Sequence, residues 1–118
     1  MELEKGEQRI LEGRGVFKGE RRIVLTNERL IFFKKKGLFG KFDTLDAVIP
    51  IDEIEECYAE ISWVTGCSMR LKLKKGRHAE IYFKGSGFAL LIGNITRHDL
   101  TQKAVTDRWV NAINNLRK

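Results

Sequence analysis

The sequence has few of the residues and patterns that mark several protein classes. Among its 118 residues there are one proline, Pro50, and two cysteines, Cys57 and Cys67. Two cysteines are too few for a disulfide scaffold, so we expect a cytoplasmic protein with reduced thiols. The longest apolar run, at 88–92, is far shorter than the roughly 20 residues that a membrane-spanning helix needs. The acidic start, Met1–Lys5, lacks the apolar core of a signal peptide.

Patterns of catalytic and metal-binding residues are also scarce. No serine or cysteine stands in a nucleophile motif, and Cys57 falls on an inward strand position, where a thiol is inert. Cys57, Cys67, His78 and His98 match a zinc site in number but not in spacing. The Gly-Ser-Gly run at 85–87 is not followed by the lysine of a phosphate-binding loop. We therefore expect neither an enzyme nor a bound metal or cofactor.

The composition is that of a soluble globular domain, with 42% hydrophobic and 32% charged residues. The length predicts a single domain over 1–118, with its core at about 7–117. The net charge of +6 favours anionic partners, such as acidic lipids, nucleic acid or acidic proteins, without choosing among them.

Short runs of alternating apolar and polar residues, separated by glycine or asparagine turns, predict seven strands. They cover 8–18, 21–26, 29–35, 46–50, 55–64, 68–74 and 78–84, with a loop at 37–44 and one tight or helical turn at 51–54. Apolar residues at helical spacing predict a helix over 99–117. The predicted fold class is mainly β with one C-terminal helix, namely a seven-stranded antiparallel barrel or sandwich that the helix closes. The segment 85–97 has no assignment.

The turns predict which residues face one another. A two-residue turn at Asn27-Glu28 pairs Leu25 with Leu30 and Ile23 with Phe32. Three-residue loops at 65–67 and 75–77 would place the apolar faces of the last three strands in register.

That second register makes a specific prediction for the last three strands. It pairs Ile61 with Leu71, and Leu71 with Ile81. It also aligns Glu60, Lys72 and Glu80 as a ladder of charges on the outer face.

The predicted helix has an apolar stripe made of Leu100, Ala104, Val105, Trp109, Ala112, Ile113 and Leu116. Trp109 is expected to anchor this helix on the sheet. Asp99 and Gln102 have the spacing of a capping box at its start.

Three segments resemble one family in the same order along the chain. The run Leu25–Phe33 resembles the LTxxRLxFF hairpin of GRAM domains and prokaryotic pleckstrin-homology (PH)-like domains. Residues 49–54 resemble the family's IPxxxI step, and Trp109 stands where PH-type domains carry a tryptophan in the last helix. The resemblance covers about 7–116. It implies a non-catalytic scaffold that binds lipids, peptides or proteins, and some members of this family self-associate.

Basic residues form two clusters around the first hairpin and the following loop. The candidate ligand-binding residues are Arg14, Lys18, Arg21, Arg22, Lys34, Lys35, Lys36 and Lys41. In PH geometry both turns lie at one open end, where they could hold an anionic headgroup. The alternative is that they are solvated loop charges, and the Lys/Arg-x-Arg step of phosphoinositide-binding members is absent. The neighbouring run 38–42 either enters a membrane interface or caps the core.

These features predict a binding module of PH/GRAM type that mediates protein interaction or self-assembly, through the free sheet edges or the groove beside the helix. The alternative is an anionic-lipid adaptor, located at the membrane surface, that uses the basic loops. Aromatic residues interleave with basic ones, as nucleic-acid binding requires, but strand periodicity assigns Phe32 and Trp63 to the core. We expect neither a nucleic-acid ligand nor a small-molecule substrate.

Overall fold

The computed structural model describes residues 3–37, 40–62, 66–83 and 98–118. Its strands are β1 (Arg9–Val16), β2 (Glu20–Thr26), β3 (Arg29–Lys35), β4 (Phe42–Pro50), β5 (Ile54–Ser62), β6 (Gly66–Leu73) and β7 (His78–Phe83). They form one antiparallel sheet in the order β4-β3-β2-β1-β7-β6-β5. The helix α2 (His98–Leu116) ends the chain, and two 3-10 turns, η1 (Ile51–Glu53) and η2 (Lys74–Gly76), join strands. The predicted fold class is confirmed.

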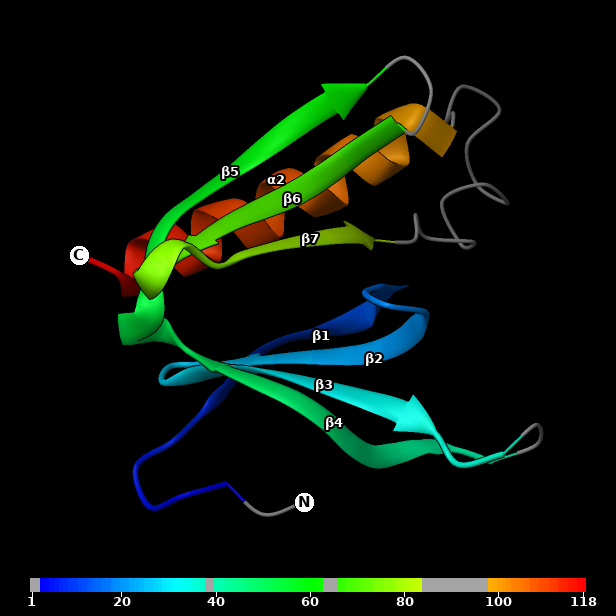
Figure 1. Ribbon diagram of the computed structural model, residues 1–118, viewed down its shortest axis with the longest axis vertical. Helices are drawn as coiled ribbons and strands as arrows, with labels where there is room; N and C mark the ends of the chain where they lie inside the picture. Colours follow the sequence, from blue (N-terminus) through cyan, green and yellow to red (C-terminus); the bar gives the residue numbers. More distant parts are fainter. Residues whose placement is uncertain (1–2, 38–39, 63–65, 84–97) are drawn as a thin grey trace.

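The sheet folds into two halves that face each other across the core (Figure 1). Strands β1–β4 form one half, and β5–β7 form the other, which α2 covers. The halves join where Gly15 pairs with Phe83 and Val16 pairs with Tyr82. A Cβ at Gly15 would lie 2.8 Å from the Tyr82 carbonyl oxygen, so this junction requires glycine.

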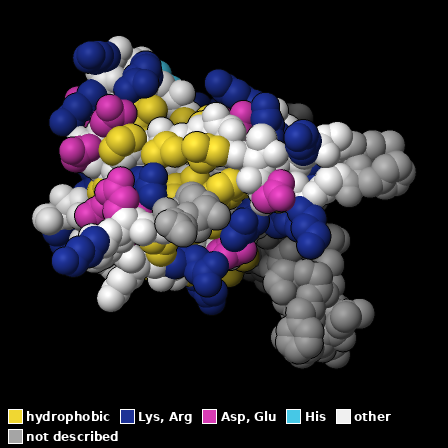
Figure 2. All heavy atoms as spheres, turned by 90° about the horizontal axis from the view of Figure 1, so that it is seen from below, with side chains coloured by type: hydrophobic (Ala, Val, Ile, Leu, Met, Phe, Trp, Pro, Cys, Tyr) yellow, Lys and Arg dark blue, Asp and Glu magenta, His cyan; other side chains and the backbone are white. Residues whose placement is uncertain are grey.

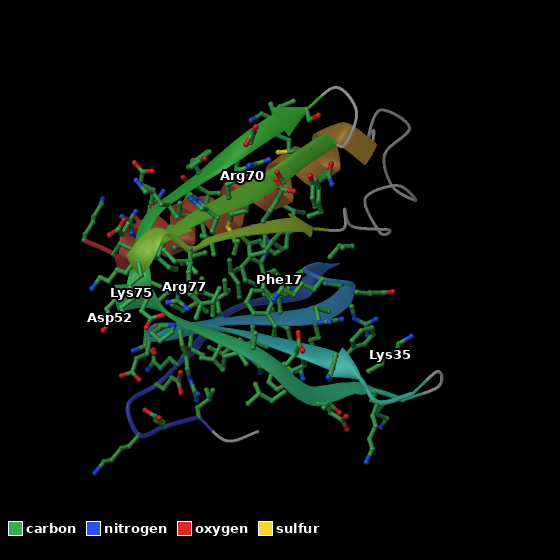
Figure 3. The ribbon with its side chains drawn as sticks, in the orientation of Figure 1. Phe17, Lys35, Asp52, Arg70, Lys75 and Arg77 are labelled. Atoms are coloured by element: carbon green, nitrogen blue, oxygen red, sulfur yellow. The ribbon has the colours of Figure 1, made fainter. Side chains whose placement is uncertain are left out.

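Side chains from both halves and from α2 fill the space between them. Ile23 and Phe32 come from the first half, Leu71 and Ile81 from the second, and all are fully or almost fully buried. Phe17 lies between the halves and stacks on Phe32, with 4.3 Å between ring centroids (Figure 3).

Helix α2 attaches to this core through Trp109, as predicted. Trp109 is 3% exposed and stacks on Phe83 with 4.6 Å between ring centroids. The buried face of the helix includes Thr106 and Val110, whereas Ala104, which we expected in the apolar stripe, is exposed. The Gln102 side chain bridges β6 and β7 by accepting from Cys67 N and donating to the Phe83 carbonyl. The side chain of its expected capping partner, Asp99, lies outside the described residues.

The hairpin between β2 and β3 has the predicted register, with Leu25 opposite Leu30 and Ile23 opposite Phe32. The predicted helical turn at 51–54 is also present, as η1. The fourth strand begins at Phe42, earlier than predicted, so part of the expected 37–44 loop is strand.

The predicted register between β5 and β6 is wrong. Ile61 lies opposite Cys67, and Leu71 lies opposite Cys57. Gly66 and Cys67 are in β6 rather than in the loop, because Ser62 already pairs with Gly66. An even shift keeps every side chain on its original face, so hydrophobic alternation could not detect the error.

The predicted register between β6 and β7 is wrong by a smaller shift, since Ile81 pairs with Met69 and not with Leu71. The turn is η2 at 74–76, closed by Leu73 N donating to the Arg77 carbonyl. Ile61, which we expected in the core, is 66% exposed. Trp63, also expected there, lies outside the described residues.

The predicted charge ladder exists with a different central residue. Arg70, not Lys72, lies opposite Glu80 and forms ion pairs with both Glu60 and Glu80. Lys72 shares this face but lies opposite Glu56 and His78.

In the described part of the chain, no helix combines the length and hydrophobicity needed to cross a membrane.

Candidate functional site

The eight candidate basic residues come from β1–β3 and from the β1–β2 and β3–β4 connections at one end of the molecule (Figure 1). The β1–β2 and β3–β4 connections lie at this same end, as we expected. Side chains alternate between the two faces of a strand, so the eight residues do not form one site. Six of them divide into a group at the mouth of the core and a group on the outer face of β1–β4.

Arg21 and Lys34 lie at the mouth of the core and share the carboxylate of Asp46. Arg21 Nε is 2.9 Å from Asp46 Oδ2, and Lys34 Nζ is 3.9 Å from Asp46 Oδ1. A β-bulge between Phe32 and Phe33 interrupts the register beside Asp46. Arg21 also donates to the carbonyls of Glu20 and Lys18, and its side chain is 14% exposed. Arg21 therefore holds the first turn in place and has little surface left for a ligand.

The other group lines a hollow on the outer face of β1–β4, which we call the basic hollow. Its cavity volume is about 790 Å³, and it is lined by Glu12, Gly13, Arg14, Arg22, Lys35, Gly40, Lys41, Phe42 and Asp43. Two basic side chains make cation–π contacts with the buried ring of Phe42. The Arg14 guanidinium carbon lies 4.0 Å from the ring centroid, and Lys35 Nζ lies 5.0 Å from it.

Cations exceed carboxylates around the basic hollow. Arg22 is neutralised by Glu12, with Nε 2.8 Å from Oε2, and this contact lowers the pKa of Glu12. Arg14 lies 3.9 Å from Glu20, a loose ion pair between exposed side chains. Lys35 and Lys41 are exposed. The hollow thus favours an anionic group. Lys18 and Lys36, which are also exposed, lie outside it.

An apolar surface adjoins the basic hollow on the same outer face. Val24, Ile31 and Phe33 form a buried cluster separate from the main core. Ile10, Leu45 and Val48 on neighbouring strands are 41%, 58% and 37% exposed. We call these six residues the outer strip. Figure 2 shows hydrophobic side chains gathered on this face with charged side chains around them.

Our sequence predictions did not include the outer strip, although the sequence signals it. Ile23-Val24-Leu25 and Leu30-Ile31-Phe32-Phe33 are continuous apolar runs rather than alternating ones. Continuous runs are typical of strands that bury both faces.

The segment before β1 contributes a leucine to this surface. Leu3 lines a groove of about 300 Å³ together with Arg9, Arg22, Val24 and Phe33. Arg22 lines both this groove and the basic hollow, so the two are neighbours.

The free edge of β5 is partly occupied by the chain itself. Arg117 donates to the carbonyls of Ile54 and Glu55, and Asn114 donates to the carbonyl of Cys57 at 3.0 Å. Asn114 and Arg117 also line an open groove of about 630 Å³ beside the helix, together with Tyr58 and Lys118. This groove is one of the surfaces that we expected to bind a partner.

The cysteines and histidines do not form a site in the described residues. Cys57 and Cys67 are buried and unpaired, and burial raises the pKa of Cys57 to about 12. Within the described ranges, no three metal-binding side chains gather. The Gly-Ser-Gly run at 85–87, the Leu38-Phe39 part of the aromatic loop and the side chain of His98 lie outside those ranges.

Searches against protein-family models and curated proteins find no match to this chain.

Proposed function

We propose that this chain is a non-catalytic binding module of the PH/GRAM type, acting in the cytoplasm, and that the outer strip binds a protein partner or a second copy. The observation that carries the proposal is the outer strip itself. A sheet needs one apolar face to build a core, and β1–β4 have two. Within the strip, Ile10, Leu45 and Val48 are exposed beside the buried Val24, Ile31 and Phe33. Exposed apolar side chains rimmed by polar residues are typical of interaction surfaces. The hairpin sequence Leu25–Phe33 supports the family assignment.

The outer strip is a better candidate than the edge of β5. Arg117 and Asn114 already bind three carbonyls of that edge, so a partner strand would have to displace them. No such displacement is needed at Leu45 and Val48, whose side chains are exposed.

Sedimentation velocity tests this assignment with two matched variants. Val48→Lys places a charge in the outer strip, and Tyr58→Lys places one at an exposed position on β5. The wild-type protein and each variant are purified and measured twice, once alone and once with the partner recovered from the source cells. We expect Val48→Lys to lose the dimer or the complex, and Tyr58→Lys to keep it. An assembly that survives Val48→Lys rules out the outer strip.

Anionic-lipid binding is the second candidate, favoured by the excess of cations around the basic hollow. Vesicle sedimentation with neutral and acidic lipids tests it. Lys35→Glu should abolish binding to acidic vesicles, and added salt should weaken binding by the wild type. Lys75→Glu is the matched control, since Lys75 is exposed at the opposite end of the molecule (Figure 3). If binding to acidic vesicles is unchanged by both Lys35→Glu and added salt, this function is excluded.

A further inference from the structure

The outer face of β1–β4 already holds a side chain from an acidic segment. Leu3 lines a groove of about 300 Å³ together with Arg9, Arg22, Val24 and Phe33, and it keeps 37% of its surface exposed. In the sequence, Leu3 stands between Glu2 and Glu4. One wall of the groove is therefore a leucine with carboxylates on either side of it in the chain.

The contacts that hold this segment lie after Leu3. Glu7 pairs with Arg29, and Gln8 N donates to Asn27 Oδ1 at 2.7 Å. Glu4 and Glu7 are joined by Glu7 N donating to the Glu4 carbonyl and by Glu4 N donating to Glu7 Oε1, both at 2.9 Å. Leu3 can therefore leave the groove without breaking the contacts of Glu7.

The basic hollow beside the groove favours negative charge, because its four cations outnumber the carboxylates of Glu12 and Asp43. Arg22 borders both the groove and the basic hollow, where Arg14, Lys35 and Lys41 add positive charge. Arg14 and Lys35 lie over the Phe42 ring, and this contact favours positions beside the hollow before an anion arrives. Fixing a binding group in advance lowers the entropy that binding must overcome.

We propose that the outer face binds an extended acidic segment of a partner protein, with a leucine in the groove that Leu3 lines and carboxylates at the basic hollow. Leu3 competes with that leucine and so weakens binding. This proposal rests on the proposed function, because it names the partner of the same face.

Fluorescence anisotropy on the full chain tests the proposal with a labelled acetyl-MELEKG-amide peptide, which copies residues 1–6. The Leu3→Ala variant removes the leucine side chain from the wall of the groove and leaves the Glu7 contacts in place. We expect this variant to bind the peptide about tenfold more tightly than the wild type does, a difference of about 1.4 kcal/mol. Equal affinity for the two proteins, or no binding to either, overturns the competition.

Two control peptides separate the chemical requirements. Replacing the leucine by alanine, or both glutamates by lysine, should each reduce the affinity of the Leu3→Ala variant at least tenfold. Equal binding of all three peptides overturns the proposal.

Lys41→Glu, added to Leu3→Ala, should weaken binding of the acidic peptide, and Lys75→Glu should not. Equal effects of the two charge reversals indicate attraction to the whole basic chain and contradict the site. Competition by acidic vesicles but not by unlabelled acidic peptide would assign the face to a membrane and also overturn the proposal.

Failure of this proposal can be distinguished from failure of the proposed function. If Val48→Lys abolishes the natural assembly while the peptide does not bind, the outer strip is an interface but its partner is not an acidic leucine segment. If Val48→Lys leaves the natural assembly intact, the proposed function itself fails.

Discussion

Glu7 and Arg29 form a two-point ion pair that fastens the segment before β1 to the first hairpin. Arg29 Nε lies 2.8 Å from Glu7 Oε2, and Arg29 Nη2 lies 3.0 Å from Glu7 Oε1. Thr26 Oγ1 donates to the same carboxylate at 2.6 Å and accepts from the backbone N–H groups of Glu28 and Arg29. The threonine and arginine of the LTxxR sequence thus hold the turn together and have a structural role.

The stability of the fold should depend on pH through Glu7. Its pKa is lowered from about 4.5 to about 2, first by the hydrogen bond from Arg29. A lowered pKa stabilises the fold above the unfolded-state value, and this stabilisation is lost as pH falls from about 5 towards 2. We expect Glu7→Gln to remove up to about 3 kcal/mol of stability at pH 7 and almost none near pH 2. Urea unfolding at several pH values measures the difference in unfolding free energy between the wild type and Glu7→Gln. A difference that stays constant with pH contradicts the prediction.

Trp109 should carry much of the attachment of α2. It is buried, stacks on Phe83 and lies against Gly13, where an added Cβ would be 3.4 Å from the ring. Trp109→Ala should cost about 3–5 kcal/mol in unfolding free energy. Arg108→Ala, at the exposed neighbouring position, should cost less than about 0.5 kcal/mol. A loss below about 1 kcal/mol for Trp109→Ala would show that the helix does not depend on this ring.

Gly15 should be intolerant of any side chain because the backbone of β7 lies directly against it. Gly15→Ala puts a methyl group 2.8 Å from the Tyr82 carbonyl oxygen and 3.2 Å from Phe83 Cα, and we expect it to cost about 1–3 kcal/mol. Gly13→Ala is the control, because its nearest neighbour is the Trp109 ring at 3.4 Å, an ordinary contact. Thermal unfolding compares the two, and equal melting temperatures would mean that the junction of β1 and β7 can adjust.

The order of elements could be predicted from the sequence because each signal was local. Asn27-Glu28 fixes its hairpin with only two residues between the strands, and the spacing around Trp109 fixes the buried face of the helix. The β5–β6 register could not be predicted, because several loops satisfy the same alternation of apolar residues.

The sequence predicted which basic residues lie near the candidate site, but not which of them form ion pairs. The sequence placed Arg21 with the other basic residues, but its pairing with Asp46 depends on a β-bulge in a different hairpin. Similarly, Glu7 and Arg29 are separated by two strands, and nothing in their local sequence indicates that they meet.

The observed register predicts that Arg70, rather than Lys72, stabilises the outer face of β5–β7. Arg70 pairs with Glu60 and Glu80, and all three side chains are partly exposed. Each pair should contribute about 0.2–1 kcal/mol. A double-mutant cycle between Arg70→Ala and Glu80→Ala should give a coupling energy in that range, while Lys72→Ala with Glu80→Ala should give almost none. Coupling between Lys72 and Glu80, with none between Arg70 and Glu80, would support the register predicted from the loop lengths.

Site-specific photo-crosslinking tests the central claim, that the outer face of β1–β4 is the binding face. A photoreactive amino acid is placed at Leu45 in the outer strip or, as a control, at Tyr58 on β5, in cells that produce the intact protein. Both positions are exposed, at 58% and 47%. We predict that position 45 gives one discrete adduct, either a dimer or a single partner protein, and that position 58 gives none. An adduct at position 58 with none at position 45 would contradict the claim.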